Sequence, residues 1–157
     1  MIVVADTTPL NYLIRLGQVG LLKSLYGEVC IPLEVVSEMK AAGAPIEVRS
    51  WAAELPAWVF VSTDTKTDDP ELLALDPGEC AAITLAIRLR GALLLLDERE
   101  GRAVAARKGV ALSGTMGVIR DGAKRGLIEF DEAVKTLRHL GFRVSDLVVD
   151  QARRGIS

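Results

Sequence analysis

Residues 2–9 read Ile2-Val3-Val4-Ala5-Asp6-Thr7-Thr8-Pro9, an apolar run that stops abruptly at an acid. The β-branched run Ile2–Ala5 is typical of a strand that is buried on both faces of a sheet. Thr8 and Pro9 then predict the N-cap and first position of a helix, which continues over Leu10–Leu16. The stretch therefore predicts a buried strand, an acid at its carboxyl end and a helix directly after it.

The same order returns further along the chain at Leu93-Leu94-Leu95-Leu96-Asp97. The length of this run and the flanking Gly91 and Asp97 favour a buried parallel strand over a helix. A helix over Glu98–Lys108 follows it. Shorter apolar runs predict three more strands, at Glu28–Ile31, Val59–Val61 and Val110–Leu112.

Helices are predicted between and after these strands. They begin at residues 32, 45 and 76 and also cover 118–125, 131–140 and 145–153, with 114–117 as a turn and 63–71 as a polar surface loop. The alternation of strands and helices indicates an α/β fold, a three-layer α/β/α sandwich with a mainly parallel central sheet. We expect residues 1–157 to form a single domain.

Composition narrows the class of protein. Half of the residues are hydrophobic (50%), which excludes a disordered chain. No apolar run is long enough to span a membrane and the N-terminus does not resemble a signal peptide, so a cytoplasmic protein is expected. Cys30 and Cys80 form no CxxC pair, and we expect both to be small core-side residues.

Charge is unevenly distributed along the chain. Residues 1–80 carry 5 Lys/Arg and 12 Asp/Glu, a balance of −7, whereas residues 81–157 carry 14 and 9, a balance of +5. Such asymmetry can indicate contact with nucleic acid, although ordinary surface variation explains it equally well on its own. In the basic half, Arg99, Arg102 and Lys124 are predicted to contact phosphates without reading sequence.

Two acids, Asp6 and Asp97, follow predicted strands directly. In open parallel sheets, ligands gather beyond the carboxyl ends of the strands, and a charge there needs water, a partner or a metal. Each acid can also serve only as a cap of the next helix, and the residues alone leave this open. Glu38 and Glu79 lie on predicted helices, and spacing alone does not distinguish them from solvated surface acids.

The scarcity of histidine excludes several kinds of active site. A Ser-His-Asp hydrolase would need His139 as its base and a G-x-S-x-G turn, which is absent. His139 lies on a late amphipathic helix, where a structural or solvated role is expected. No Walker loop and no G-x-G-x-x-G occurs, so a bound nucleotide is not predicted.

Four strings resemble, in the right order, the signatures of the PIN-domain family. They are Val3–Leu10, Ile31–Glu38, Leu75–Ile83 and Leu94–Glu98. Two later strings, Gly101–Ala103 and Gly114–Val118, resemble a prokaryotic PIN-like subgroup whose members are often toxin-like. The resemblance extends from Ile2 to about Ser145.

The resemblance implies an acidic tetrad that binds metal and performs catalysis: Asp6, Glu38, Glu79 and Asp97. It further implies that Thr7 and Glu98 are auxiliary residues. Glu34 also matches an acid of the motif region but lies one turn from Glu38 and ranks lower. Glu79 departs from the family's pattern, because many members have Asp there, yet its longer side chain can still reach a metal.

The resemblance also implies an activity, a cofactor and partners. The activity is metal-dependent endoribonucleolytic cleavage of single-stranded RNA, with the basic residues named above on the RNA backbone. Carboxylate oxygens suit hard cations such as Mg²⁺ or Mn²⁺, which lower the pKa of bound water. The subgroup implies the toxin of a type II toxin–antitoxin pair, an antitoxin protein as partner and a homodimer. The apolar helices at Leu10–Leu16 and Val19–Leu25 are candidate interfaces.

Two other hypotheses remain. The first is a catalytically inactive PIN-like module that binds RNA or a protein. The second is a receiver-like signalling domain, which also uses strand-end acids and Mg²⁺ in a parallel sheet. Against the second, Asp6 has no acidic neighbour in sequence and no Lys ends a late strand.

Overall fold

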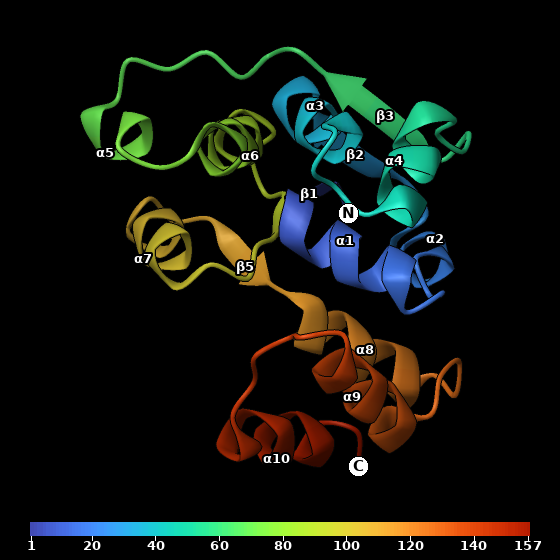
Figure 1. Cartoon of the computed structure of the whole chain (residues 1–157). Helices are drawn as coiled ribbons and strands as arrows, with labels where there is room; N and C mark the ends of the chain where they lie inside the picture. The colour runs from blue at the N-terminus through green and yellow to red at the C-terminus, as the bar shows by residue number, and fades with distance from the viewer.

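A five-stranded sheet, in which every strand runs parallel to its neighbours, forms the centre of the molecule (Figure 1). The computed structural model describes residues 1–157. The strands are β1 (Val3–Ala5), β2 (Val29–Pro32), β3 (Val59–Ser62), β4 (Leu93–Leu95) and β5 (Ala111–Ser113), in the spatial order β3-β2-β1-β4-β5. Each observed strand lies within one residue of a predicted one, and the parallel sheet is confirmed.

Ten helices surround the sheet. They are α1 (Thr7–Arg15), α2 (Gly20–Tyr26), α3 (Leu33–Lys40), α4 (Ile46–Ala53), α5 (Pro70–Leu73), α6 (Pro77–Arg88), α7 (Arg99–Arg107), α8 (Thr115–Lys124), α9 (Phe130–His139) and α10 (Asp146–Arg154). None of them is long and apolar enough to cross a membrane.

Local sequence explains where the helices begin and end. The Oδ1 of Asp76 accepts a hydrogen bond from the backbone N–H of Glu79 at 2.9 Å and caps α6, as the predicted helix start requires. Glycines at positive φ follow α6 and α7, Gly91 at 79° and Gly109 at 78°, so the chain turns back toward the sheet at both places.

Alternate residues of the central strands face opposite layers. Val3 and Ala5 of β1 pack into one hydrophobic cluster with α1–α4 and α8–α10, whereas Val4 packs into a second cluster with α5–α7. Leu95 of β4 belongs to the first cluster and Leu94 to the second. Figure 1 shows α5, α6 and α7 on one side of the sheet and the other helices across from them. The predicted three-layer α/β/α sandwich is confirmed.

Two predicted helix starts are wrong. Helix α8 begins at Thr115, within the segment 114–117 expected to be a turn, because the backbone N–H of Thr115 donates to the side chain of the distant Asp97. Helix α1 begins at Thr7 with Asp6 rather than Thr8 at its N-cap. Pro9 is then the third helical residue, which is tolerated because the first N–H groups of a helix have no intrahelical partner.

Four leucines of the early helices belong to the hydrophobic core. Leu10, Leu13 and Leu22 are fully buried and Leu21 is nearly so. Ile14, Leu16 and Leu25 are only partly buried, so the interface expected on these two helices stays a prediction.

The strand order fixes where a ligand would bind. The chain proceeds from β1 outward to β2 and β3, and then crosses to β4 on the other side of β1. The order therefore reverses between β1 and β4, and in open α/β sheets ligands bind outside the carboxyl ends of the strands at such a point. Receiver domains have the order 2-1-3-4-5, so the receiver-like alternative is wrong on topology.

Candidate acidic site at the carboxyl ends of β1 and β4

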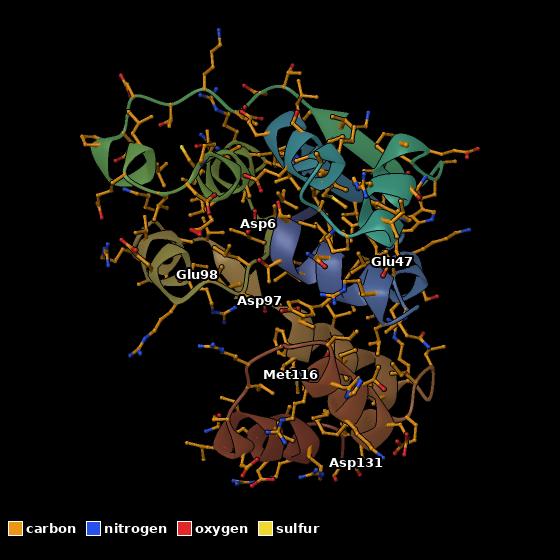
Figure 2. The ribbon with its side chains drawn as sticks, in the orientation of Figure 1. Asp6, Glu47, Asp97, Glu98, Met116 and Asp131 are labelled. Carbon is orange, nitrogen blue, oxygen red and sulfur yellow. The ribbon has the colours of Figure 1, made fainter.

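Asp6 and Asp97 lie on either side of the point where the strand order reverses. Asp6 directly follows β1, and its backbone N–H donates to the carbonyl of Leu95 on β4 at 3.0 Å. Asp97 follows β4 after one further residue, Leu96. In Figure 2 both labelled acids lie near the middle of the molecule, whereas Glu47 and Asp131 lie far from them. The fold thus brings together two acids that are ninety-one positions apart in sequence.

Asp6 is buried among other acids. It is only 5% exposed, and this burial raises its pKa from 3.8 to about 7, against the opposing hydrogen bond from the backbone of Thr7. The like charges of Asp76, Glu38 and Asp97 raise the pKa further. The ionised form of Asp6 is therefore unfavourable near neutral pH unless a cation balances its charge.

Glu38 approaches this group from the second turn of α3. The hydroxyl of Thr7 donates to its Oε2 at 2.5 Å, which ties α3 to the start of α1. Gly78, in the first turn of α6, makes room for the same carboxylate, since a Cβ at position 78 would lie 2.5 Å from Glu38 Oε1. The absence of a side chain at Gly78 therefore lets α6 pack closely against the acid of α3.

Glu79 enters from the first turn of α6 and is 7% exposed. Burial raises its pKa from 4.5 to about 8, and the charges of Asp76, Asp6 and Glu98, with a hydrogen bond to Asp76, act in the same direction. Its carboxylate rests against Gly101 of α7, where a Cβ would lie 3.0 Å from Glu79 Oε2. Small residues on α6 and α7 thus provide the space that the two glutamates occupy.

Asp97 is held differently. Its Oδ1 and Oδ2 accept hydrogen bonds from the backbone N–H and the hydroxyl of Thr115, at 2.8 and 2.6 Å. Burial raises its pKa above 3.8, while the two bonds from Thr115 and the charge of Arg102 oppose the rise. Thr115 is fully buried at the first position of α8, so Asp97 also satisfies that helix N-terminus.

Sequence reasoning missed Asp76 as part of this group. The sequence pattern predicts only a helix start at Asp76. The residue does cap α6, yet its charge also acts on Asp6 and on Glu79. The signal was present in the string Leu75-Asp76-Pro77-Gly78-Glu79, which places two acids three residues apart at one helix N-terminus. Thr115 was missed as well, since its partner Asp97 is remote in sequence.

The donor set fits a hard divalent cation by its chemistry. All of its side-chain ligand atoms would be carboxylate oxygens, and the mutual repulsion of these acids is what a cation would relieve. No three His, Cys, Asp or Glu side chains already have the spacing needed to hold one ion. Glu38 and Asp97 instead bond to Thr7 and Thr115. Convergence on an ion would therefore require the longer glutamates to rotate.

A basic groove opens from Asp97. It has a volume of about 880 Å³ and runs between α7, α8 and the segment from Phe142 to Ala152. Four arginines line it, namely Arg99, Arg102, Arg120 and Arg143. Arg120 pairs with Asp121 at 3.0 Å, whereas no ion pair involves Arg99 or Arg143. The groove thus presents cationic groups next to the acidic site.

The predicted phosphate-binding residues have unequal positions. Arg99 is exposed at the start of α7, and Arg102 lines the groove while its Nη1 donates to the carbonyls of Leu96 (2.7 Å) and Ser113 (2.9 Å). Arg102 therefore also joins the ends of β4 and β5. Lys124 is exposed at the far end of α8, roughly 13.5 Å along the helix from Thr115, and does not line the groove.

Comparison with known proteins places the chain in a family. The family model DUF3368, described as a PIN domain, matches residues 2–157. Searches of curated proteins and of solved structures gave no match. PIN domains are generally nucleases and typically use divalent metal ions. With a match over almost its whole length, and with the signatures in the order described above, the chain belongs to the PIN-domain family.

Proposed function

We propose that this PIN domain is a metal-dependent endoribonuclease that cleaves single-stranded RNA, with Mg²⁺ or Mn²⁺ bound by Asp6, Glu38, Glu79 and Asp97. One observation carries the proposal: near the point where the strand order reverses, the charges of Glu38 and Asp97 act on Asp6 and that of Asp6 acts on Glu79, and burial with this repulsion raises the pKa of Asp6 to about 7 and of Glu79 to about 8. Acids whose pKa values are strongly perturbed by burial and by neighbouring charges are typical of functional sites.

The acids and threonines of the site would have different roles in binding the metal ion. Asp6 and Asp97, fixed on neighbouring strands, would set the position of the ion, and Glu38 and Glu79 would complete its ligands from the helices. The bound ion supplies a lowered pKa for water and charge neutralisation at the phosphate. Thr7 would orient Glu38 through its hydrogen bond, and Thr115 would do the same for Asp97. Glu98, exposed at the N-cap of α7, would act only through its charge.

The basic groove supports RNA as the substrate. Arg99, Arg102 and Arg143 offer guanidinium groups to phosphates on the side of Asp97. A strand without a pairing partner bends into such a groove more readily than a duplex does, and its bases are free for contact. Lys124 would reach RNA only if the strand continued along α8.

Cleavage of a mixed-sequence single-stranded RNA tests the proposal. Wild-type protein should cut it with Mn²⁺ and not with EDTA, and Asp97→Asn should not cut it. Glu47→Gln is the matched control, because Glu47 is an exposed acid on α4 far from Asp6 and Asp97 (Figure 2). Equal cleavage by wild type and Asp97→Asn would refute the assignment of the site.

A catalytically inactive module that binds RNA or protein is the alternative. The observation in its favour is that no three of the acids have the spacing of a metal site. Pure wild-type protein that binds RNA but cuts none of several RNAs with either metal would establish it.

We further propose that the protein is the toxin of a type II toxin–antitoxin pair, forms a homodimer and is inhibited by an antitoxin protein. The support is the resemblance of Gly101–Ala103 and Gly114–Val118 to a toxin-like subgroup. Induced expression of wild type, but not of Asp97→Asn, should arrest bacterial growth, and light scattering should give twice the mass of 16.9 kDa. Unimpaired growth with active enzyme would contradict the toxin role.

A further inference from the structure

A second pocket lies beside α6, where Pro77, Cys80 and Ala81 line it. It has a volume of about 430 Å³ and is bounded by α3, the segment after β3 and the start of α6. Leu73, Leu75, Pro77 and Cys80 form an apolar wall, and Thr65, Lys66 and Thr67 also line the pocket. Glu34 of α3 is its acidic residue. An apolar pocket with one or two placed polar groups is the usual form of a site for a flat organic ligand.

The carboxylate of Glu34 is only half satisfied. Its Oε2 accepts a hydrogen bond from the hydroxyl of Thr65 at 2.6 Å, whereas its Oε1 is buried and has no partner. A buried acceptor without a donor is unfavourable and needs an explanation. Since the last torsion of a glutamate is broad, rotation of the carboxyl group can turn either oxygen toward the pocket.

The outer wall of the pocket is fixed in place. Arg88 of α6 pairs with Asp64 at 3.0 Å and donates to the carbonyl of Lys66, which holds the segment carrying Thr65. At the other end of that segment, Lys108 of α7 pairs with Asp69 at 2.8 Å. The pocket is therefore built from anchored elements.

The pocket adjoins the acidic site. Glu34 lies four residues before Glu38 on α3, so their side chains are neighbours about 5–6 Å apart at Cβ. On α6, Pro77 lines the pocket while the adjacent Gly78 faces Glu38. A nucleotide whose phosphate lies at the acids can thus place an adjoining base beside Glu34.

We infer that this pocket binds a guanine base of the RNA substrate, and that Glu34 accepts hydrogen bonds from its N1–H and exocyclic N2–H. The inference rests on the proposed ribonuclease function. Guanine alone presents two adjacent N–H donors on its pairing edge, which match the two acceptor oxygens of a carboxylate. Adenine and cytosine offer one donor beside an acceptor, and uracil offers one donor between two acceptors. The apolar wall would pack on the ring, as in other pockets for extruded bases.

Binding of labelled uridine hexamers that carry one central guanosine, inosine or adenosine tests this without cleavage, in EDTA. Inosine lacks only the N2 amino group, so wild type should bind the guanosine hexamer about tenfold more tightly than the inosine one. Glu34→Gln should lose this preference, because an amide presents a donor where guanine needs an acceptor. Glu47→Gln should keep it.

Leu73→Ala provides a second variant that leaves the core intact, because Leu73 is 59% exposed while lining the pocket. It should weaken binding of the guanosine hexamer severalfold. Equal affinities of wild type for the three hexamers would overturn the inference even if the protein cleaves RNA. A guanosine preference that survives Glu34→Gln in a folded variant would overturn it too. A Glu34-dependent preference in a protein that never cleaves would uphold the pocket and reject the nuclease.

Discussion

The two sides of the acidic site are built on different physical principles. On the Asp6 side, Asp6, Glu38, Asp76 and Glu79 crowd together, and repulsion and burial raise the pKa values of Asp6 and Glu79. On the Asp97 side, burial also raises the pKa, but two hydrogen bonds from Thr115 and the charge of Arg102 oppose the rise. A cation would relieve the first side, whereas the second is held in place by hydrogen bonds within the protein.

The largest expected effect is a loss of RNA cleavage, which substitutions on either side should cause. Asp6→Asn and Asp97→Asn should each lower kcat/KM for RNA about 1000-fold, because polarisation by a metal is worth several kcal/mol. The free energy of unfolding in EDTA at pH 8 should separate them. Asp6→Asn should stabilise the protein by a few kcal/mol, since it removes a buried charge, whereas Asp97→Asn should destabilise it by about 1–3 kcal/mol through a lost bond to Thr115. Urea unfolding that shifts both variants in the same direction would contradict the comparison.

The pH dependence of stability should be dominated by the Asp6 side, because the raised pKa values of Asp6 and Glu79 are the large shifts of the site, while that of Asp97 is also raised. An acid whose pKa is higher in the folded state than in the unfolded state stabilises the fold when the pH is below its unfolded-state pKa. This stabilisation is lost as the pH rises through the folded-state pKa. For Asp6 this window runs from 3.8 to about 7, and for Glu79 from 4.5 to about 8. In EDTA the free energy of unfolding should therefore fall by a few kcal/mol between about pH 4 and pH 8.

Other acids set the control for that measurement. Asp69 and Glu71 have lowered pKa values owing first to hydrogen bonds from Lys108 and Arg107, respectively, so their contribution is present at high pH and is lost as the pH falls. Saturating Mn²⁺ should restore stability at pH 8 far more than at pH 5, and should do so less in Asp6→Asn. If the free energy of unfolding of the wild type in EDTA rises steadily up to pH 8, the acids on the Asp6 side do not destabilise the folded protein.

The smallest effects come from the two threonines that orient the acids. Thr115→Val should lower stability by about 1–2 kcal/mol, because the fully buried Thr115 loses its bond to the Asp97 carboxylate, and should move the acidic limb of the pH–rate profile upward. Thr7→Val, at a half-buried bond to Glu38, should lower stability by less than about 1 kcal/mol. Chemical denaturation measures the stability of both variants, and kcat/KM against pH gives their pH–rate profiles. Equal losses of stability in Thr115→Val and Thr7→Val would contradict the difference between the two sides.

Much of this arrangement could be predicted from sequence because its signals are local. An apolar run that ends in an acid marks both Asp6 and Asp97, and parallel strands must bring such ends to one edge. The alternation of strands and helices gave the sheet. Glu38 and Glu79 followed only from resemblance to a family, since a glutamate on a helix carries no sign of which way it faces.

What could not be predicted depends on contacts between distant residues. The start of α8 at Thr115 rests on Asp97, eighteen positions earlier, and no turn rule contains that partner. The effect of the Asp76 charge on Asp6 and Glu79 could not be predicted either, because capping of α6 already accounts for an Asp at this position. The half-satisfied Glu34 is visible only once Thr65, thirty-one positions later, is placed beside it.

The close approach of Gly78 to Glu38 has a practical consequence for anyone who wishes to trap the protein with RNA. A methyl group at position 78 would collide with the end of a flexible side chain rather than with backbone, so the Glu38 carboxylate would have to swing away while the helices stay in place. Under the proposed function, Gly78→Ala would be an inactive protein that keeps every acid and every arginine. Such a protein could be produced safely in a living cell and still hold its natural substrate for crystallography.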